Sequence, residues 1–348
     1  MSRHVSHMPS SCLHLVLRLV ATLMLAQSAQ GEGMPVPAVC AVCQMNPPGS
    51  AVLYVETRKD GAGERARQMV YSMALAARIG MNFGGVHVGE VGSVSHLAET
   101  FPALSKLFGA DGVSMFYKEL PQPMEQFRTL SRMQANLSSN LRGTGVFLNH
   151  SFVQGEMIVS FTRHTELGHY ITNRFLQTWR HKSGLGSVPL TFQAGRPSMA
   201  VHLRRGDVTP HRYGTRYTPD TFYLAMINRI RLLLSNVDLH VFSDYFHDDE
   251  EETYEDGLGA TLHLQEDITS DWAHFAYADI VILAKSTFSG IPAMLNTKCV
   301  IMPSSRYPKT IPLPEWLLVD QDTAHIQSAD LDQRLRACLA RQPFRLKG

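Results

Sequence analysis

The chain has 348 residues, of which 44% are hydrophobic and 18% are charged. This length and composition suffice for a large hydrophobic core, and the length favours two domains over one. Because 32 Lys and Arg residues oppose 31 Asp and Glu residues, the formal net charge is only +1. Such a chain has no bulk field that attracts nucleic acid or an anionic membrane, so we expect no nucleic-acid partner.

The N-terminal segment has the layout of a secretory signal. Arg3 and two histidines precede a mostly apolar run at residues 13–25, and small residues follow up to Gly31. Arg18 interrupts the run, which is shorter than the roughly 20 residues that span a bilayer. We expect residues 1–31 to be a cleaved signal peptide, with a type II anchor through residues 13–25 as the alternative. Either interpretation places the protein in the endoplasmic reticulum or Golgi, soluble in the lumen or anchored to the membrane.

Cysteines and glycosylation signals agree with a luminal protein. Four cysteines remain if Cys12 leaves with the signal: Cys40, Cys43, Cys299 and Cys338. We expect one or two structural disulfides among them, with the pairing open. The Cys40–Cys43 spacing also fits half of a redox or zinc site, but no second pair at ligand spacing exists. Two Asn-x-Ser sequons predict N-glycosylation at Asn136 and Asn149.

The first half of the mature chain begins with a strand, a glycine turn and a helix. Residues 32–50 are rich in Pro and Gly and predict an N-terminal arm or stem. A β-like run at 51–57 leads through Gly61 and Gly63 into a helix at 64–79 with apolar residues at helical spacing. Further along, the patterns predict a strand at 145–149, a helix at 165–181 and a polar boundary segment at 182–197.

The second half alternates regularly between strands and helices. Strands are predicted at 199–203, 239–243, 280–284 and 300–302. Helices are predicted at 271–277, after Ser289, and at 218–234, where Thr218 is the cap and Pro219 takes the first position. This alternation predicts an α/β fold with a doubly wound parallel sheet, whose site lies at the carboxyl ends of the strands. Two such domains, at 51–190 and 191–340, would face each other across an interdomain cleft.

The most specific motif is the run Val-His-Leu-Arg-Arg-Gly-Asp at residues 201–207, which starts on a predicted strand and ends in a turn. Adjacent guanidinium groups are costly to bury without anionic partners. A pyrophosphate suits Arg204 and Arg205, because guanidinium binds phosphate through paired, charge-assisted hydrogen bonds. We expect one arginine to stabilise a departing diphosphate and the other to hold Asp207 or another carboxylate. The alternative is an internal Arg–Asp salt-bridge cluster.

A second motif, at residues 277–290, joins Asp279, an apolar strand and the turn Ser286-Thr287-Phe288. Hydroxyls and amides at a helix start can bind phosphate, although Ser and Thr there are also common helix caps. The Asp279 carboxylate is suited to accept hydrogen bonds from a guanine base. Asp244 ends another predicted strand at the same edge, and it is either a nucleotide contact or a turn cap.

Together these motifs resemble those of the α1,2-, α1,6- and protein O-fucosyltransferase superfamily. Residues 201–207 are similar to its His-x-Arg-Arg-x-Asp signature, and Asp279 with residues 285–289 resembles its later guanine- and phosphate-binding motif. The turn at Gly61 and Gly63 resembles the family's glycine-rich N-terminal motif. The resemblance implies a GT-B fold of two Rossmann-like domains, GDP-fucose as donor, inversion at the sugar, and no metal or other cofactor. The candidate donor-binding residues are Gly61, Gly63, His202, Arg204, Arg205, Asp207, Asp244, Asp279, Ser286, Thr287 and Phe288.

The sequence departs from the family pattern at two places. Glu64 stands where the family usually has Asn or Asp, and Gly290-Ile-Pro replaces the Trp-Trp-Gly of many α1,2 enzymes. The acceptor is therefore open between an N-glycan core, a galactoside, another polysaccharide and a protein Ser or Thr.

The sequence leaves the catalytic base open. His202 and Asp207 are candidates, although a histidine within a strand is more often structural. A base from the N-terminal domain or from the acceptor is equally compatible with the sequence. The acidic run at 247–252 predicts a solvated loop rather than a metal site, because metal-binding carboxylates usually follow an apolar strand directly.

The sequence thus predicts an inverting fucosyltransferase-like enzyme, with an acceptor-side domain at 51–190 and a donor-binding domain at 191–340. Arg204 or Arg205 would stabilise the leaving diphosphate, and a glycan or glycoprotein would accept the sugar. The alternatives are a GT-B transferase for another nucleotide sugar and a catalytically silent luminal glycan-binding or scaffold protein. A kinase or nucleotide hydrolase is disfavoured, because the Gly-Lys-Ser/Thr phosphate loop is absent from the sequence.

Overall fold

The computed structural model describes residues 52–56, 61–78, 82–87, 97–109, 116–117, 128–129, 145–148, 171–246, 248–304, 312–322, 324 and 328–341. The predicted signal and stem, Cys40, Cys43, Asn136 and Asn149 lie outside these ranges. Among the helices within them, none is long and apolar enough to cross a membrane.

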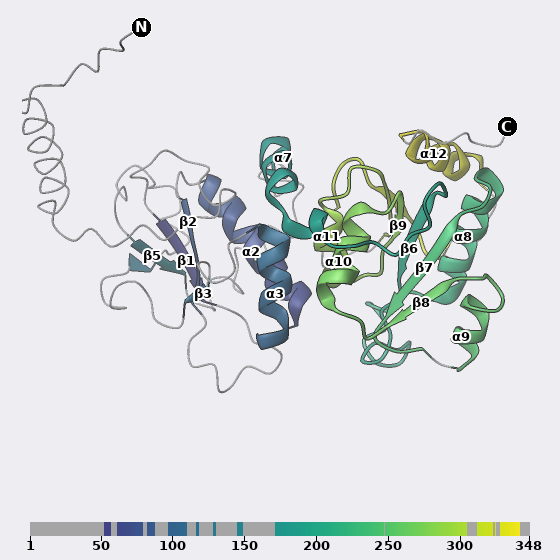
Figure 1. Ribbon diagram of the computed structural model, residues 1–348, viewed down its shortest axis with the longest axis horizontal. Coiled ribbons are helices and arrows are strands. Elements are labelled where there is room, and N and C mark those ends of the chain that lie inside the picture. The colour runs from purple at the N-terminus through teal and green to yellow at the C-terminus, as the bar shows by residue number, and fades with distance from the viewer. Residues whose placement is uncertain are drawn as a thin grey trace, which may run out of the picture. The chain divides into compact units, whose positions relative to one another are not determined.

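The first half of the chain forms a five-stranded parallel sheet with the order β3-β2-β1-β5-β4 (Figure 1). Its strands are β1 (Val52–Glu56), β2 (Asn82–His87), β3 (Phe116–Tyr117), β4 (Arg128–Thr129) and β5 (Gly145–Leu148). Helix α2 (Ala62–Arg78) connects β1 to β2, and α3 (Leu97–Phe108) follows β2. The predicted strand and helix are therefore confirmed; Gly61 directly precedes the helix, and Gly63, predicted in the turn, lies in its first turn.

The second half forms a six-stranded parallel sheet with the order β11-β10-β9-β6-β7-β8. Its strands are β6 (Ser198–His202), β7 (Asp238–Ser243), β8 (Thr261–Leu264), β9 (Ile280–Ile282), β10 (Cys299–Pro303) and β11 (Leu317–Val319). The chain steps outward from β6 to β8, returns to β9 beside β6, and steps outward again to β11. This is the doubly wound order of dinucleotide-binding sheets, with its switch point between β6 and β9. The predicted α/β class with parallel, Rossmann-like sheets, as in the GT-B type, is confirmed.

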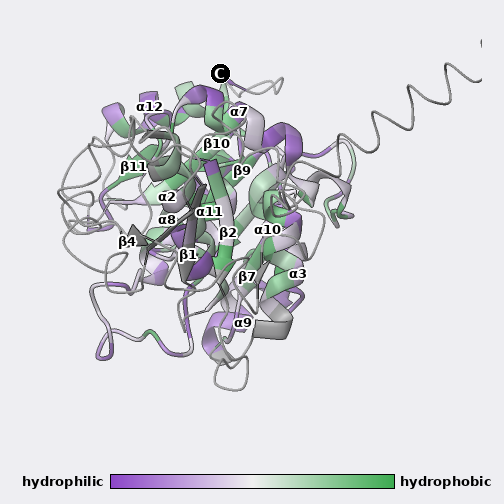
Figure 2. Cartoon of the chain, turned by 90° about the vertical axis from the view of Figure 1, so that its left-hand side faces the viewer, coloured by the Kyte–Doolittle hydropathy of each residue, from purple (hydrophilic) through white to green (hydrophobic). Residues whose placement is uncertain are grey.

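Helices cover both faces of the six-stranded sheet. They are α7 (Asn173–Lys182), α8 (Asp220–Leu233), α9 (Asp248–Tyr254), α10 (Ile268–Tyr277), α11 (Thr287–Ala293) and α12 (Ala329–Leu339), and a short 3₁₀ helix, η5, spans Gly184–Ser187. The hydrophobic strands β9 and β10, green in Figure 2, are buried along their whole length. Burial on both faces explains why their sequences are continuous apolar runs.

Two hydrophobic cores lie on opposite faces of this sheet, because successive side chains of a strand point to opposite sides. Ala200 and Val281 belong to the core that contains α2, α3, α10 and α11. Val201 and Ile282 belong to the core that contains α8 and α12. Helices of the first half thus share a core with the second half, which brings α2 against α11.

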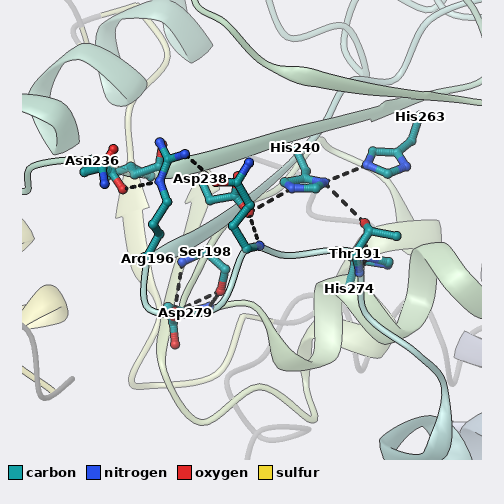
Figure 3. Close-up of polar contacts among 11 residues, drawn as sticks. Thr191, Arg196, Ser198, Asn236, Asp238, His240, His263, His274 and Asp279 are labelled. Carbon is teal, nitrogen blue, oxygen red and sulfur yellow. Dashed lines mark hydrogen bonds and ion pairs between the residues drawn. The ribbon is translucent and has the colours of Figure 1, made fainter.

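The segment 188–197, within the predicted boundary, is tied to the six-stranded sheet (Figure 3). Thr191 contacts His274 Nε2 through its Oγ1 at 2.9 Å, and the Gln193 amide donates to Asp238 Oδ2 at 2.7 Å. His240 lies between Asp238, at 3.0 Å, and His263, at 2.8 Å. Burial lowers the pKa of His240 and His274, which favours the neutral form of both rings. Both rings serve as structural hydrogen-bonding groups of the sheet.

Two details of the predicted elements were wrong. The acidic run predicted as a solvated loop is helical in α9, where Glu250 is buried. Glu250 tolerates burial because it pairs with Arg205 at 2.5 Å. The N-cap of α8 is Pro219, not Thr218.

One disulfide links strand β10 to helix α12. Cys299 and Cys338 are bonded, and both are buried in the same core. Helix α12, yellow in Figure 1, packs against α8 and lies near the C-terminal end of the described chain. The disulfide therefore fixes this last helix to a central strand, as one of the structural disulfides that the sequence predicts.

Loss of the disulfide is expected to destabilise the fold. Cross-linking residues separated by 39 positions restricts the unfolded chain, which corresponds to a stabilisation of up to about 4 kcal/mol. Thermal unfolding with and without reductant should show a lower Tm for the reduced protein. The double variant Cys299→Ser, Cys338→Ser is the control: a Tm that still falls with reductant would assign the effect to other cysteines.

Candidate functional site

The predicted motifs meet at the switch point of the six-stranded sheet. Residues 203–207 follow the carboxyl end of β6, and residues 283–288 follow that of β9, its neighbour in the sheet. Between them lies a pocket of about 600 Å³. Eight of the eleven candidate donor-binding residues line it: Gly61, Gly63, Arg204, Asp207, Asp244, Ser286, Thr287 and Phe288.

Arg204 presents its guanidinium to this pocket. It donates to Asp244 Oδ2 at 2.8 Å and lies 2.6 Å from Asp207 Oδ1. Its side chain is 27% exposed, whereas those of Asp207 and Asp244 are 47% and 62% exposed. The two carboxylates thus hold Arg204 in place but remain in contact with solvent, so a stronger anionic ligand can replace either of them.

Arg205 points away from the pocket and into a buried ionic network. Its Nε donates to Glu250 at 2.5 Å and its Nη2 donates to Asp220 at 2.7 Å. Burial lowers the pKa of Arg205, but Tyr223, Asp220 and Glu250 raise it well above its ordinary value. Arg205 therefore holds carboxylates, as the sequence predicts for one of the two arginines. Ligand binding by the other arginine stays a prediction, and Arg204 is the one that lines the pocket.

The network around Arg205 connects three elements. Tyr254 of α9 donates to Asp220 of α8 at 2.7 Å, and the ring of Tyr217 lies 4.8 Å from the Arg205 guanidinium. Arg205 Nη1 also donates to the Thr218 carbonyl at 3.2 Å. These contacts fix the turn after β6, and with it the direction in which Arg204 points.

His202 is buried rather than open to the pocket. Its Nδ1 lies 2.8 Å from Ser289 Oγ, and its ring packs 5.5 Å from that of Phe288. Burial, followed by the charges of Arg204 and Arg205, lowers its pKa to about 3. A buried and neutral imidazole of this kind positions the turn at Phe288, and it is a poor candidate for the general base.

Asp279 lies at the amino end of β9, whereas the pocket lies at the carboxyl ends of the strands; Figure 3 shows its contacts with Ser198. It accepts from the amide and the hydroxyl of Ser198, both at 2.9 Å, and from Lys298 Nζ at 2.6 Å. Ser198 begins β6 and Asp279 precedes β9, so both mark the amino ends of parallel strands. These contacts give Asp279 a structural role, and the geometry offers no support for its predicted contact with a nucleotide base.

Gly63, in the first turn of α2, allows close contact between two helices. A Cβ added to Gly63 would lie 2.4 Å from the Phe288 nitrogen and 2.5 Å from its Cα. No side chain fits there, so Gly63 lets the start of α2 pack on the start of α11. The Phe288 amide already donates to Ser286 Oγ at 3.2 Å. A ligand would therefore meet the side chains of this turn rather than the Phe288 amide.

Asp271 is a pocket residue that the sequence prediction used only as the start of a helix. It lies in the first turn of α10, and its buried Oδ1 makes no hydrogen bond within the part of the chain that the structure describes. Burial, together with Glu266, Asp244 and Asp267, raises its pKa to about 8. Below that pH Asp271 is a neutral carboxyl group that can donate a hydrogen bond to a ligand. Its position one turn after Asp267, beside the switch point, is visible only in three dimensions.

The pocket combines cations with a larger number of carboxyl groups. Arg204, Arg216 and Lys285 line it together with Glu64, Asp207, Asp244, Glu266 and Asp271. Lys285 donates to the Tyr217 carbonyl at 3.2 Å, and burial lowers its pKa although Asp322 and Asp320 oppose the shift. Across the described ranges, no group of three or more His, Cys, Asp or Glu residues is arranged to hold a metal ion. The arrangement can bind a polar anion through guanidinium, ammonium and hydroxyl groups.

No protein-family model and no curated protein sequence matches the chain. Among solved structures, E. coli heptosyltransferase WaaC with ADP-2-deoxy-2-fluoro heptose is 12% identical, covers 82% of this chain and 99% of its own, and has a TM-score of 0.41. POFUT1 in complex with GDP-fucose is 12% identical, with coverages of 78% and 98% and a TM-score of 0.38. A variant of Arabidopsis thaliana FUT1 in complex with GDP is 11% identical, with coverages of 78% and 75% and a TM-score of 0.39. These likenesses are distant, and the fold class of this chain follows from its own strand orders.

Replacing Gly63 by Ala is expected to disturb the contact between α2 and α11. The new methyl group would overlap backbone atoms of Phe288, and overpacking of this kind typically costs about 1–3 kcal/mol. Thermal unfolding should show a lower Tm for Gly63→Ala. Gly61→Ala is the matched control, because its Cβ would meet nothing within 4 Å; equal effects of the two substitutions would contradict the role given to Gly63.

Replacing Asp271 by Asn is expected to stabilise the fold in a pH-dependent way. The carboxyl is neutral up to a pKa of about 8 in the folded chain, against an ordinary value of 3.8. The unfolded chain releases this proton from pH 4 upward, so the wild type loses stability between pH 4 and 8, by at most about 1.4 kcal/mol per pH unit. The Tm advantage of Asp271→Asn should therefore grow over that range and level off above it.

The same pH series on the exposed Asp256→Asn variant supplies the control. No pH-dependent gain is expected there, because Asp256 lies at the surface. A constant or shrinking advantage of Asp271→Asn between pH 4 and 8 would show that Asp271 titrates as an ordinary carboxylate.

Proposed function

We propose that this chain is an inverting glycosyltransferase that binds a nucleotide sugar in the switch-point pocket, with GDP-fucose as the donor. The observation that carries the proposal is the position of Arg204, at the carboxyl end of β6 and in the same pocket as Ser286 and Thr287. In doubly wound sheets this position is where nucleotide phosphates bind. The choice of GDP-fucose rests on the sequence resemblance of residues 201–207 to the fucosyltransferase signature.

In the proposed reaction, an acceptor hydroxyl attacks the anomeric carbon of the donor sugar from the side opposite the diphosphate. The bond between this carbon and the diphosphate oxygen breaks, and the electron pair leaves with the diphosphate. Arg204 stabilises the negative charge that develops there, because a guanidinium held in place at this position pairs with phosphate oxygens through charge-assisted hydrogen bonds. To do so, it exchanges one of its two carboxylate partners for the ligand. We propose that cations lining the pocket, Arg204 among them, supply the positive charge without a metal or other cofactor.

The acceptor proton needs a base within hydrogen-bond reach of the attacking hydroxyl. His202 is unsuitable, since it is buried, and Arg204 and Arg205 help to lower its pKa. Glu64 of α2 and Asp207 of the turn after β6 both line the pocket. We therefore propose these two carboxylates as the candidate bases, one from each half of the chain.

The proposed setting is the lumen of the endoplasmic reticulum or Golgi, with a glycan or glycoprotein as acceptor. The buried Cys299–Cys338 disulfide supports it, because disulfides persist in oxidising compartments. The N-terminal signal pattern and the two sequons in the sequence point the same way.

Two alternatives keep the same pocket. Another nucleotide sugar would occupy the pocket if the residues that contact the nucleotide base select a base other than guanine. A silent glycan-binding protein would have the fold without the reaction, but it would not need Arg204 in the pocket, held by Asp207 and Asp244.

The first experiment is calorimetric titration of the protein with GDP, UDP and ADP in EDTA. Binding of GDP with a preference over UDP and ADP is expected. A preference for UDP or ADP would exclude GDP-fucose as donor, and no binding of any nucleotide to a folded sample would contradict the proposed function.

Alanine variants should separate the two arginines. Arg204→Ala is expected to keep the wild-type Tm and to weaken GDP binding by at least about tenfold, since it removes a charge-assisted contact to phosphate. Arg205→Ala is expected to lower the Tm strongly, because breaking a buried ion pair leaves uncompensated carboxylates at Asp220 and Glu250, typically at about 3–5 kcal/mol. Thermal unfolding and titration on both variants test this; an unchanged Tm for Arg205→Ala would contradict its structural role.

A further inference from the structure

A third cation of the pocket comes from the loop between β6 and α8. Arg216 lines the pocket together with Arg204 and Lys285. Arg204 is held by two carboxylates, and Lys285 donates to the Tyr217 carbonyl. For Arg216, the described part of the chain supplies no carboxylate partner, and its guanidinium lies over the ring of Tyr213, 5.2 Å from the centroid. Arg216 is thus an exposed cation that no acid among the described residues neutralises.

The loop holds Arg216 in this position through its neighbours. The Arg216 amide donates to the Tyr213 carbonyl at 2.7 Å, and the Tyr217 amide donates to the Gly214 carbonyl at 3.1 Å. Tyr217 in turn contacts one residue of each motif. Its carbonyl accepts from Lys285, and its ring lies 4.8 Å from the Arg205 guanidinium. The backbone of Arg216 is thereby tied to the two motifs that build the pocket.

Tyr213 adopts a strained backbone conformation, with φ at 62°. The left-handed region is unfavourable for a bulky residue, and such strain often persists at ligand-binding sites. Arg212 and Arg216 both lie over the Tyr213 ring, at 5.4 and 5.2 Å from its centroid. Only Arg216 of these two lines the pocket.

Carboxyl groups outnumber cations in the pocket, so an anionic ligand would need a further cation to bind there. Five carboxyl groups and three cations line it, and Asp207 and Asp244 already compensate Arg204. A diphosphate would meet net repulsion from the carboxylates unless a second uncompensated cation faced it. Since Lys285 is buried and engaged with Tyr217, Arg216 is the side chain that is both charged and able to move toward the ligand.

We propose that Arg216 is a second phosphate-binding arginine, which pairs with the diphosphate of the donor from the loop side of the pocket. The inference rests on the proposed function, because it concerns the same donor. Arg204 holds the diphosphate from the strand end, and Arg216 approaches from the loop between β6 and α8. A planar guanidinium suits this role, since it can bind two phosphate oxygens at once.

The test compares Arg216→Ala with Arg212→Ala, a matched control from the same loop and the same stacking partner. Calorimetric titrations with GDP, GMP and inorganic pyrophosphate are made on both variants and on the wild type, with Tm as a check of folding. Arg216→Ala is expected to weaken GDP and pyrophosphate binding by about tenfold or more and GMP binding clearly less. Arg212→Ala is expected to change each affinity by less than about twofold.

The conservative variant Arg216→Lys sharpens the comparison. It is expected to recover part of the GDP affinity, because lysine keeps the charge but loses the paired geometry. Wild-type GDP affinity in Arg216→Ala, or an equal loss in Arg212→Ala, would overturn the inference while leaving the proposed function intact. Pyrophosphate binding that depends on Arg216, without binding of any nucleotide, would support the phosphate site and overturn the proposed donor. A wild type that binds none of these ligands would overturn both.

Discussion

The site depends on one buried interaction, the ionic network of Arg205. A guanidinium without partners could not stay at a buried position, and Glu250 and Asp220 provide those partners from α9 and α8. Because Arg205 is fixed inward, the adjacent Arg204 is directed outward, into the pocket between the ends of β6 and β9. The motif thus places one of two identical side chains in a buried network and the other in the pocket, because Asp220 and Glu250 pair with Arg205 alone.

The doubly wound sheet decides where this pocket lies. Its strand order reverses between β6 and β9, so the loops after these strands diverge and leave room for a ligand. Helix α2 reaches the same place from the first half, because Gly63 offers no side chain where its helix meets Phe288. Residues far apart in the chain, such as Gly61, Arg204 and Thr287, therefore line one pocket.

Electrostatics in the pocket are mixed rather than uniformly positive. The carboxylates of Asp207 and Asp244 pair with Arg204 and fix its position. Burial and the acids around Asp271 raise its pKa to about 8. Such an arrangement suits a ligand with one strongly anionic part and one part rich in hydrogen-bonding groups, as in a nucleotide sugar. The net charge of +1 over the whole chain does not indicate this arrangement, because it depends on the local charges of the pocket residues.

The sequence by itself determined the α/β class, most strands and helices of the second half, and the arginine pair with the turn at Ser286 to Phe288. These follow from local patterns: apolar runs, helical spacing, and adjacent charges that burial would penalise. Tertiary structure alone decided which arginine faces the pocket, that Glu250 is buried, that Cys299 pairs with Cys338, and that Asp271 rather than Asp279 lines the pocket. The physical reason is that these roles depend on partners distant in sequence, and on which end of a strand a residue occupies once parallel strands align.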